Sequence, residues 1–232
     1  MKRFSYFKLL GITILWLSLL NSCNTGNSLG DYKGTPYSDV EYRNGAQAIP
    51  GKIQCEYYDF GSEGIAYHDS DSINSGSGNL NPVNGSYLHE FRINENVDIS
   101  YTKSKGVDDN DYNLVEPEMD QLYVGWTNPG EWIKYTIDVK ISGLYQVGIM
   151  YTANDNGQIS LSQNNIDTTG PLDILSTYVK EDTLSWRQWH HWNYLDNIAE
   201  IEFKKGKQTL TLHTVANGQM NYDYLDFSFI SK

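Results

Sequence analysis

Regular alternation of hydrophobic and polar residues marks four segments in the second half of the chain. In "EWIKYTIDV", every second residue from Ile133 to Val139 is hydrophobic, and the same alternation recurs in "GLYQVGIMYT", "KQTLTLHTV" and "YLDFSFI". Because successive side chains of a strand point to opposite faces, each segment predicts a strand with one buried face. Turn-forming sequences such as "NDNG" and "KKGK" separate the segments. Short strands joined by such turns indicate an antiparallel sandwich or barrel.

The residues predicted to share these buried faces are Ile133, Tyr135, Ile137, Val139, Tyr145, Val147, Ile149, Tyr151, Leu210, Leu212, Leu225, Phe227 and Phe229. The stretch 70–120 is poor in strand patterns and rich in Asn, Asp, Ser and Gly. Loops of that length in a compact domain usually carry function or cover another element. Beyond the N-terminal segment no long stretch keeps a helical period, so the fold class predicted is all-β.

The N-terminus has the pattern of a targeting segment. "MKRFSYFK" carries three basic residues and no acidic one, and an apolar run of 12 residues, "LLGITILWLSLL", follows it. That run is too short to span a bilayer, which needs about 20 residues, and suits the hydrophobic region of a signal peptide. The run ends at "LNSC", which resembles the lipobox of bacterial lipoproteins and would make Cys23 the lipidated residue. The alternative is an ordinary secretory signal with an incidental cysteine.

These patterns divide the chain into three parts. Residues 1–22 are expected to be a lipoprotein signal peptide. Residues 23–50, which are polar and broken by Gly, Asn, Asp and Pro, are expected to be a flexible tether. Residues 51–232 are expected to form the folded domain. If Cys23 carries lipid, Cys55 has no disulfide partner and is expected to be a small buried hydrophobic residue.

Composition narrows the classes of function. The chain of 232 residues is 39% hydrophobic and has a formal net charge of −12, which suits a folded domain and argues against a nucleic-acid partner. The excess of acidic residues either only keeps the protein soluble or includes carboxylates that bind a cation. The sequence contains no G-x-S-x-G, phosphate-loop or H-E-x-x-H motif. The pair at 190–191, "HH", would point to opposite faces of a strand, which is poor geometry for a metal.

Five segments in order carry a family resemblance: "IQCEYYDFGSEGIAYHDSD", "FRINENVDI", "YVGWTNPGEWIKYTIDV", "WRQWHHW" and "MNYDYLDFSFI". They resemble the motifs of family 6 carbohydrate-binding modules, over about residues 51–232. The resemblance implies a jelly-roll-type β-sandwich of two antiparallel sheets. It also implies a glycan site in loops at one end of the sandwich and a structural calcium ion.

In such modules an aromatic pair clamps a sugar ring. By matching motifs, the resemblance assigns that pair to Phe91 and Trp186, and a hydrogen-bonding amide to Asn221. Glu63, in the "GSEG" loop, either flanks the same site or is a solvated loop charge. The chemistry is sound because the apolar C–H faces of sugars stack on aromatic rings while their hydroxyls need directional partners. A regular strand cannot bury on one face two tryptophans that are three positions apart. At least one of Trp186 and Trp189 should therefore face out or lie in a loop, and the resemblance implies that Trp186 is the exposed platform and Trp189 the core residue.

The remaining aromatic and oxygen-bearing residues receive structural roles from the same resemblance. Trp126 and Trp132, in "GWTNPGEW", are expected to be mainly structural. Calcium prefers several oxygen ligands. Gln54 and Glu56 share the strand face opposite Cys55, and Asp226 points away from the core face of the last strand. If the first and last strands are neighbours, these three side chains, Gln54, Glu56 and Asp226, converge on one edge and predict a Ca²⁺ site. The family usually has Glu where Gln54 stands.

The function predicted is non-catalytic binding of a polysaccharide or oligosaccharide by a lipid-anchored protein of the bacterial envelope. The outer membrane, at the cell surface, is the expected location, and glycoside hydrolases or a transporter are the expected partners. One rival is a small glycoside hydrolase or lyase that uses Asp69, Asp71 or Glu63. The alternative to a catalytic role for Asp69 and Asp71 is that they are turn residues. A third possibility is a structural domain that binds another protein, which an exposed apolar patch far from Trp186 would favour.

Overall fold

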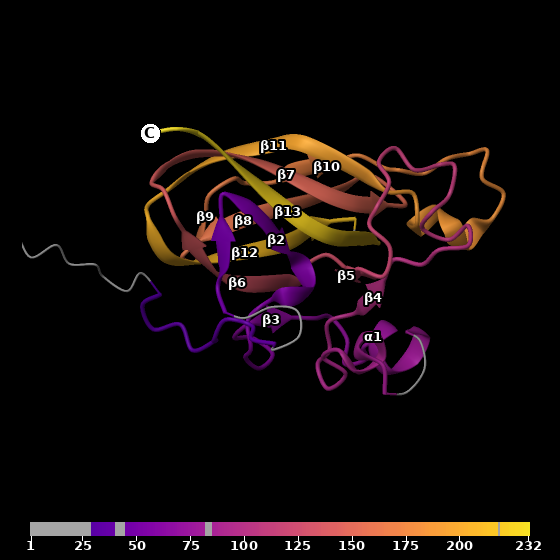
Figure 1. Ribbon diagram of the computed structural model, residues 1–232, viewed down its shortest axis with the longest axis horizontal. Coiled ribbons are helices and arrows are strands. Elements are labelled where there is room, and N and C mark those ends of the chain that lie inside the picture. The colour runs from indigo at the N-terminus through magenta and orange to yellow at the C-terminus, as the bar shows by residue number, and fades with distance from the viewer. Residues whose placement is uncertain (1–28, 40–44, 82–84, 218) are drawn as a thin grey trace, which may run out of the picture.

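The computed structural model describes residues 29–39, 45–81, 85–217 and 219–232. The predicted signal peptide and Cys23 lie outside the described residues. Figure 1 shows two layers of β-sheet packed face to face, with the long loops gathered at the end opposite the C-terminus. The prediction of an all-β sandwich is confirmed. None of the helices in the described ranges combines the length and the apolar character that a membrane crossing needs.

One sheet has seven strands, in the order β1-β6-β12-β8-β10, with β3 also paired to β6 and β9 also paired to β8. Its strands are β1 (Gln47–Ile49), β3 (Tyr67–His68), β6 (Trp132–Val139), β8 (Gly157–Gln163), β9 (Ile166–Asp167), β10 (Leu172–Ile174) and β12 (Gly206–Ala216). Strand β12 is central and pairs antiparallel with both β6 and β8.

The other sheet has six strands, in the order β11-β7-β13-β5-β4, with β2 also paired to β13. Its strands are β2 (Gly51–Gln54), β4 (Ile99–Tyr101), β5 (Leu122–Val124), β7 (Gly143–Ala153), β11 (Asn193–Phe203) and β13 (Met220–Ser231). The first strand of this sheet, β2, lies beside the last, β13, which meets the condition of the calcium argument from the sequence. The short helical turns are η1 (Cys55–Tyr57), η2 (Gly76–Leu80), α1 (Tyr87–Glu90) and η3 (Ser185–Trp189).

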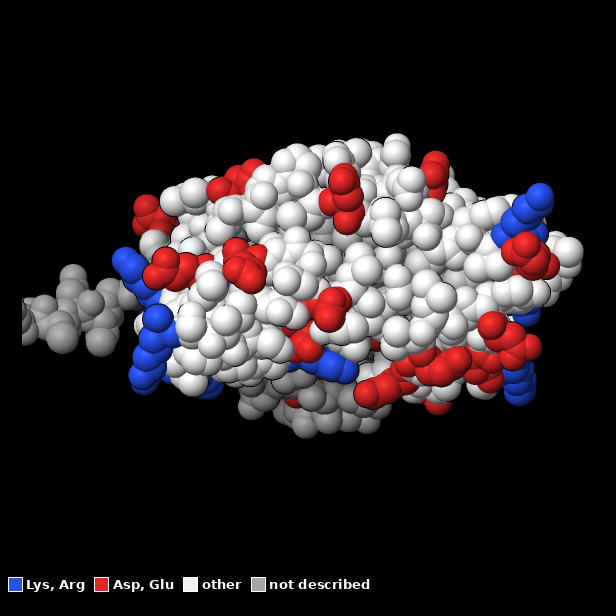
Figure 2. Space-filling view, turned by 90° about the horizontal axis from the view of Figure 1, so that it is seen from above, with Lys and Arg blue, Asp and Glu red and all other residues white. Residues whose placement is uncertain are grey.

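The core lies between the two sheets and contains the residues that the alternation placed there. Ile137, Val147 and Leu210 are fully buried in one continuous cluster, together with Cys55. Phe229 is the exception among the predicted core positions, since it is only partly buried and packs on the edge of the cluster. Figure 2 shows that acidic side chains lie in several patches of one face, while basic ones lie mainly near its two ends.

The folded part begins before the expected boundary at Gly51. Strand β1 pairs with β6 in the parallel direction, so the sheets are not wholly antiparallel. Upstream of β1, Thr35 and Phe60 exchange two backbone hydrogen bonds of 2.9 and 2.7 Å. Tyr37 is buried and stacks on Tyr57 at a centroid distance of 5.1 Å. The described part of the expected tether is therefore packed onto the sandwich, because its aromatic side chain completes the core at that edge.

Candidate functional site

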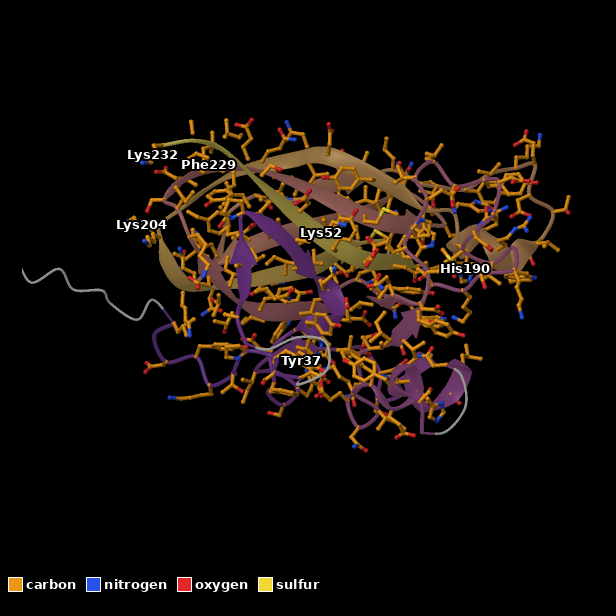
Figure 3. All side chains as sticks on the ribbon, in the orientation of Figure 1. Tyr37, Lys52, His190, Lys204, Phe229 and Lys232 are labelled. Carbon is orange, nitrogen blue, oxygen red and sulfur yellow. The ribbon has the colours of Figure 1, made fainter. Side chains whose placement is uncertain are left out.

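A groove of about 830 Å³ opens at the end of the sandwich where β5 and β7 end and β13 begins. Figure 3 labels His190 near this end, whereas Lys204 and Lys232 mark the opposite end. The groove is lined by loop residues and strand ends: Asp71, Ser75, Leu80, Asp98, Ser100, Lys103, Val107, Tyr123, Trp126, Asn128, Trp186, Trp189, His190, Gln219 and Asn221. Three of these residues are tryptophans, which is an unusual concentration in one solvent-filled space and marks it as the candidate site.

Two of the tryptophans come from the turn η3. A 3₁₀-helix has about three residues per turn, so side chains three positions apart lie on the same side. Trp186 and Trp189 consequently both line the groove, and Trp186 is 49% exposed. The exposed position expected for Trp186 agrees with the structure. The core position expected for Trp189 is wrong: Trp189 is half-buried, and the fully buried tryptophan of this segment is Trp192.

Asn221, at the start of β13, lies at the base of the groove beside η3. Its amide group donates hydrogen bonds to Thr152 Oγ1 at 2.9 Å and to the backbone oxygen of Trp189 at 2.7 Å. Thr152 donates to the same Trp189 oxygen at 2.8 Å. Both amide protons of Asn221 are therefore used to hold the end of η3, and only its Oδ1 remains to accept a hydrogen bond from a ligand.

Trp126 is a lining residue that the sequence interpretation assigned to a structural role. Its side chain is 40% exposed, and its backbone has a φ of 48°. A bulky residue in the left-handed region is uncommon, and such strain often occurs at functional sites. The preceding Gly125 permits this arrangement, because a Cβ there would lie 2.8 Å from Asn221 Oδ1. The sequence feature that could have indicated an exposed tryptophan here is "GW" directly after a strand and shortly before the "NPG" turn.

Phe91 does not line the groove, and the prediction that it stacks on a sugar is wrong. Its side chain is 4% exposed and belongs to the core cluster. The rings of Tyr37, Tyr57 and Tyr87 surround it at centroid distances of 5.6, 5.9 and 5.4 Å. The upstream segment that carries Tyr37 covers this position, so no face of Phe91 is left for a ligand.

Glu63 also lies elsewhere than predicted, since it is not among the residues that line the groove. Its carboxylate pairs with His68 Nδ1 and accepts a hydrogen bond from the backbone N–H of Asp69 at 3.1 Å. Asp69 and Asp71 each accept a hydrogen bond from the backbone N–H two residues later, at 3.0 and 2.7 Å. Both aspartates therefore have the turn role that was the alternative to a catalytic role in the sequence analysis.

A buried ion pair fixes the turn that carries the tryptophans. Arg187 donates two hydrogen bonds to Asp182, at 2.7 and 2.9 Å, and His191 contacts the same carboxylate at 2.8 Å. The hydrogen bonds from Arg187 hold the pKa of Asp182 well below its usual range. His191 is 1% exposed, whereas its neighbour His190 lines the groove. The two rings therefore have different surroundings: His191 contacts Asp182, and His190 contacts Asp108.

The charged groups of the groove are mainly acidic on the wall formed by the loop 71–80 and the start of β4. Burial raises the pKa of Asp98 to about 6, the N–H of Ser75 opposes this rise, and the charges of Asp71 and Glu131 add to it. On another wall, burial lowers the pKa of Lys103. The Lys103 ammonium group already donates to Ser100 Oγ at 2.9 Å and to the backbone oxygen of Tyr101 at 3.0 Å.

A second group of oxygen atoms lies away from the groove, where β2 and η1 meet β13. Tyr224 of β13 is opposite Gln54, and Gln54 Oε1 is buried without a hydrogen-bond partner. Burial raises the pKa of the Cys55 thiol, and the charges of Glu56 and Asp223 add to that rise. Burial also raises the pKa of Asp223 to about 7.

Asp226, the predicted third ligand, is not brought to this place. It lies opposite Lys52 and accepts a hydrogen bond from the Tyr194 hydroxyl at 3.2 Å. The buried carboxyl of this part of β13 is that of Asp223, which follows Tyr222 where the register of β13 with β7 shifts. Within the described ranges no cluster of three or more His, Cys, Asp or Glu side chains is suited to a metal. The group here consists of two carboxylates and an amide.

Comparison of the sequence with those of known protein families identifies one matching family. The sequence profile described as "Carbohydrate binding module (family 6)" matches residues 99–231, which is more than half of the chain. No curated protein matches the chain significantly.

Similar solved structures include a family 6 module from Clostridium stercorarium in complex with cellobiose, at 14% identity over 81% of this chain and 100% of that chain, with a TM-score of 0.47. A family 35 module from Clostridium thermocellum has 18% identity over 57% of this chain and 88% of that chain, with a TM-score of 0.41. The C-terminal family 6 module of a marine laminarinase from Zobellia galactanivorans has 18% identity over 47% and 81%, with a TM-score of 0.36.

Proposed function

The chain belongs to family 6 of the carbohydrate-binding modules, and we propose that it binds polysaccharide or oligosaccharide in the groove at the end of the sandwich. The observation that carries this proposal is the set of tryptophans, Trp126, Trp186 and Trp189, around one groove that also contains Asn221. The indole rings would stack on the apolar faces of sugar rings, and Asn221 Oδ1 would accept a hydrogen bond from a hydroxyl.

Pre-organisation of the tryptophans supports this role. The turn η3 is fixed from below by Asn221 and Thr152 and from the side by the Asp182–Arg187 pair. A rigid aromatic platform loses little conformational freedom when a ligand binds, which preserves affinity for a small contact. A ligand of a few sugar rings should still bind weakly, with a Kd of roughly tens of micromolar to millimolar.

Binding without catalysis is the second part of the proposal. Asp69 and Asp71 serve as turn acceptors, and Glu63 pairs with His68 outside the groove. One observation favours a hydrolase as the alternative: Asp71 and Asp98 both line the groove, and burial raises the pKa of Asp98 to about 6. A protonated acid beside an ionised carboxylate is the arrangement that glycoside hydrolysis uses. Reducing-end assays with the Asp98→Asn variant as control distinguish the two functions.

The test of glycan binding is affinity electrophoresis and calorimetry of the protein against xylan, laminarin, mixed-linkage β-glucan and agarose. Trp186→Ala and Trp126→Ala each remove one groove wall. Tyr178→Ala is the matched control, since Tyr178 is 54% exposed and does not line the groove. We expect binding to one glycan class that both tryptophan variants weaken and the control retains. Binding that survives both tryptophan substitutions would refute the groove as the site.

We also propose a structural calcium ion held by Gln54, Glu56 and Asp223. A buried amide oxygen without a hydrogen-bond partner and two buried carboxyls, all from β2, η1 and β13, would fit a hard cation that prefers oxygen ligands. Calcium would compensate the two carboxylate charges and tie β2 to β13. The position of this group, away from the groove, makes the ion a support of the fold and not a ligand of the glycan.

Export and lipid anchoring at Cys23 complete the proposed role. The basic N-terminus, the short apolar run and "LNSC" support this proposal. The protein would hold glycan at the envelope, at the outer membrane and its surface, for partner hydrolases or a transporter. Metabolic labelling with a palmitate analogue tests the anchor. The wild-type protein should be labelled and should fractionate with membranes. The Cys23→Ser variant should not be labelled and should not fractionate with membranes.

A further inference from the structure

His190 is held against the groove by a buried carboxylate. Asp108 is fully buried, and its Oδ1 contacts His190 Nδ1 at 2.8 Å. Two further donors fix the same carboxylate: Trp192 Nε1 donates to Oδ1 at 2.7 Å, and the backbone N–H of Lys103 donates to Oδ2 at 2.7 Å. Asp108 therefore has no freedom to turn away from the histidine, and the ring of His190 is fixed with it.

This contact determines where the proton of the neutral ring resides. A carboxylate only accepts hydrogen bonds, so the proton between His190 and Asp108 belongs to Nδ1 of the imidazole. The other ring nitrogen, Nε2, then has a free lone pair. The orientation of a histidine through one nitrogen, so that the second can act, is a common arrangement at binding and catalytic sites.

The second nitrogen is available to a ligand. His190 lines the groove, its side chain is 18% exposed, and no residue in the described ranges forms a hydrogen bond with Nε2. The ring lies edge-on to Trp186, with a centroid distance of 6.0 Å and an interplanar angle of 70°. A sugar stacked on Trp186 would place its hydroxyl groups within reach of this part of the groove wall.

The polar neighbours in the groove are also acceptors. Both amide protons of Asn221 are engaged, which leaves Oδ1. The amide of Asn128 donates to the backbone oxygen of Trp126 and to Glu131. The carboxylate of Asp98 is a further acceptor in the lining, beside the indole N–H groups of the three tryptophans, which are donors. A free hydroxyl of a ligand can donate to the acceptors, whereas sulfate and methyl ether groups cannot.

We propose that His190, positioned by Asp108, is a specificity-determining residue of the groove: its Nε2 accepts a hydrogen bond from a free hydroxyl of a glycan bound on Trp186. The proposal rests on the proposed function and deepens it in two ways. It adds a ligand-contacting residue that the motif comparison did not assign. It also names the ligand class as glycans whose hydroxyl is unsubstituted at this contact.

The first experiment is ¹⁵N nuclear magnetic resonance of the imidazole nitrogens, at mildly alkaline pH, with laminaritetraose, xylotetraose and cellotetraose as probes. In the free protein, His190 should show the tautomer with the proton on Nδ1. On addition of the oligosaccharide that binds, the Nε2 resonance should move toward that of a hydrogen-bonded acceptor while the Nδ1 resonance stays. A free protein with the proton on Nε2, or a bound state with an unmoved Nε2 resonance, overturns the proposal.

The second experiment compares His190→Ala with His190→Gln by calorimetry. The loss of one neutral hydrogen bond should weaken glycan binding roughly fivefold in the alanine variant. Glutamine places its Oε1 near the original Nε2 and should recover most of that loss. Equal weakening in both variants would indicate a packing role and refute the acceptor. The indole proton of Trp192 reports whether the Asp108 network stays intact in each variant.

The two experiments separate this proposal from the proposed function. If an oligosaccharide binds and Trp186→Ala abolishes the binding, but His190 shows no response, only the role of His190 fails. If none of the three probes and no polysaccharide of the panel binds, the proposed function itself fails. A sulfated or per-O-methylated form of the bound oligosaccharide that binds as tightly as the parent would refute the assignment of ligand class.

Discussion

Removal of calcium should reveal an electrostatic cost at Asp223 that depends on pH. Burial raises the pKa of this carboxyl from 3.8 to about 7, against the opposing charge of Lys52. Because the folded state holds this proton more tightly than the unfolded chain does, the contribution of Asp223 to the metal-free stability is greatest below pH 3.8 and falls as pH rises to about 7. At about 1.4 kcal/mol for each pH unit, ionisation of this one group costs about 4 kcal/mol.

Urea unfolding at about pH 5 and about pH 8 measures this cost. About 3 kcal/mol of it falls between those two conditions. Asp223→Asn is the informative variant, because it cannot ionise, while the contributions of Asp69 and Asp98 are common to both proteins and cancel. In EDTA, wild-type protein should lose about 3 kcal/mol more than the variant between the two pH values.

Calcium should reverse the order of stability at the higher pH. The ion compensates the Asp223 carboxylate in the wild-type protein and finds one charged ligand fewer in Asp223→Asn. With calcium at about pH 8, wild-type protein should therefore be the more stable of the two. Equal pH dependence of both proteins in EDTA would refute the buried carboxylate, and a stability unaffected by calcium would refute the metal site.

Three further predictions concern the groove and its support. Phe91→Ala should lower the free energy of unfolding by about 3–5 kcal/mol, the usual cost of removing a buried phenylalanine, and should leave the glycan affinity of the folded protein unchanged, which thermal unfolding and calorimetry check together. Trp126→Ala should weaken glycan binding roughly tenfold, as much as Trp186→Ala, whereas retained affinity would limit Trp126 to a structural role. Asp182→Asn should loosen η3, which faster amide hydrogen exchange over Ser185–Trp189 and a weaker glycan affinity would show; unchanged exchange would contradict the anchoring role of the ion pair.

The long strands of the sandwich were predictable because their side chains repeat with the period of two that a half-buried strand imposes. Strands β6, β7, β12 and β13 include the segments with alternating residues, and the core faces match almost to the last position. Phe229 is less buried than its phase suggested because it lies near the end of β13, at the edge of the core.

The site was predictable only in part, because loop geometry and distant contacts decide it. The period of three in η3 turned Trp189 into the groove, and no strand pattern could indicate that. The burial of Phe91 depends on Tyr37, which lies 54 positions earlier in the sequence. The position of Asp226 opposite Lys52, and not opposite Gln54, depends on the pairing register of β2 with β13. Each of these features is a tertiary or irregular feature with no local periodicity to reveal it.

Indole resonances offer the most direct test of the groove as the glycan site. Trp126, Trp186 and Trp189 line the groove, whereas Trp192 is fully buried under the loops and Trp132 lies outside the lining. We would titrate the protein with the oligosaccharide identified from the panel and record the assigned indole N–H signals. The account predicts saturable shifts of the three groove tryptophans, with Trp132 and Trp192 unmoved. Binding that leaves the groove tryptophans unmoved would contradict it.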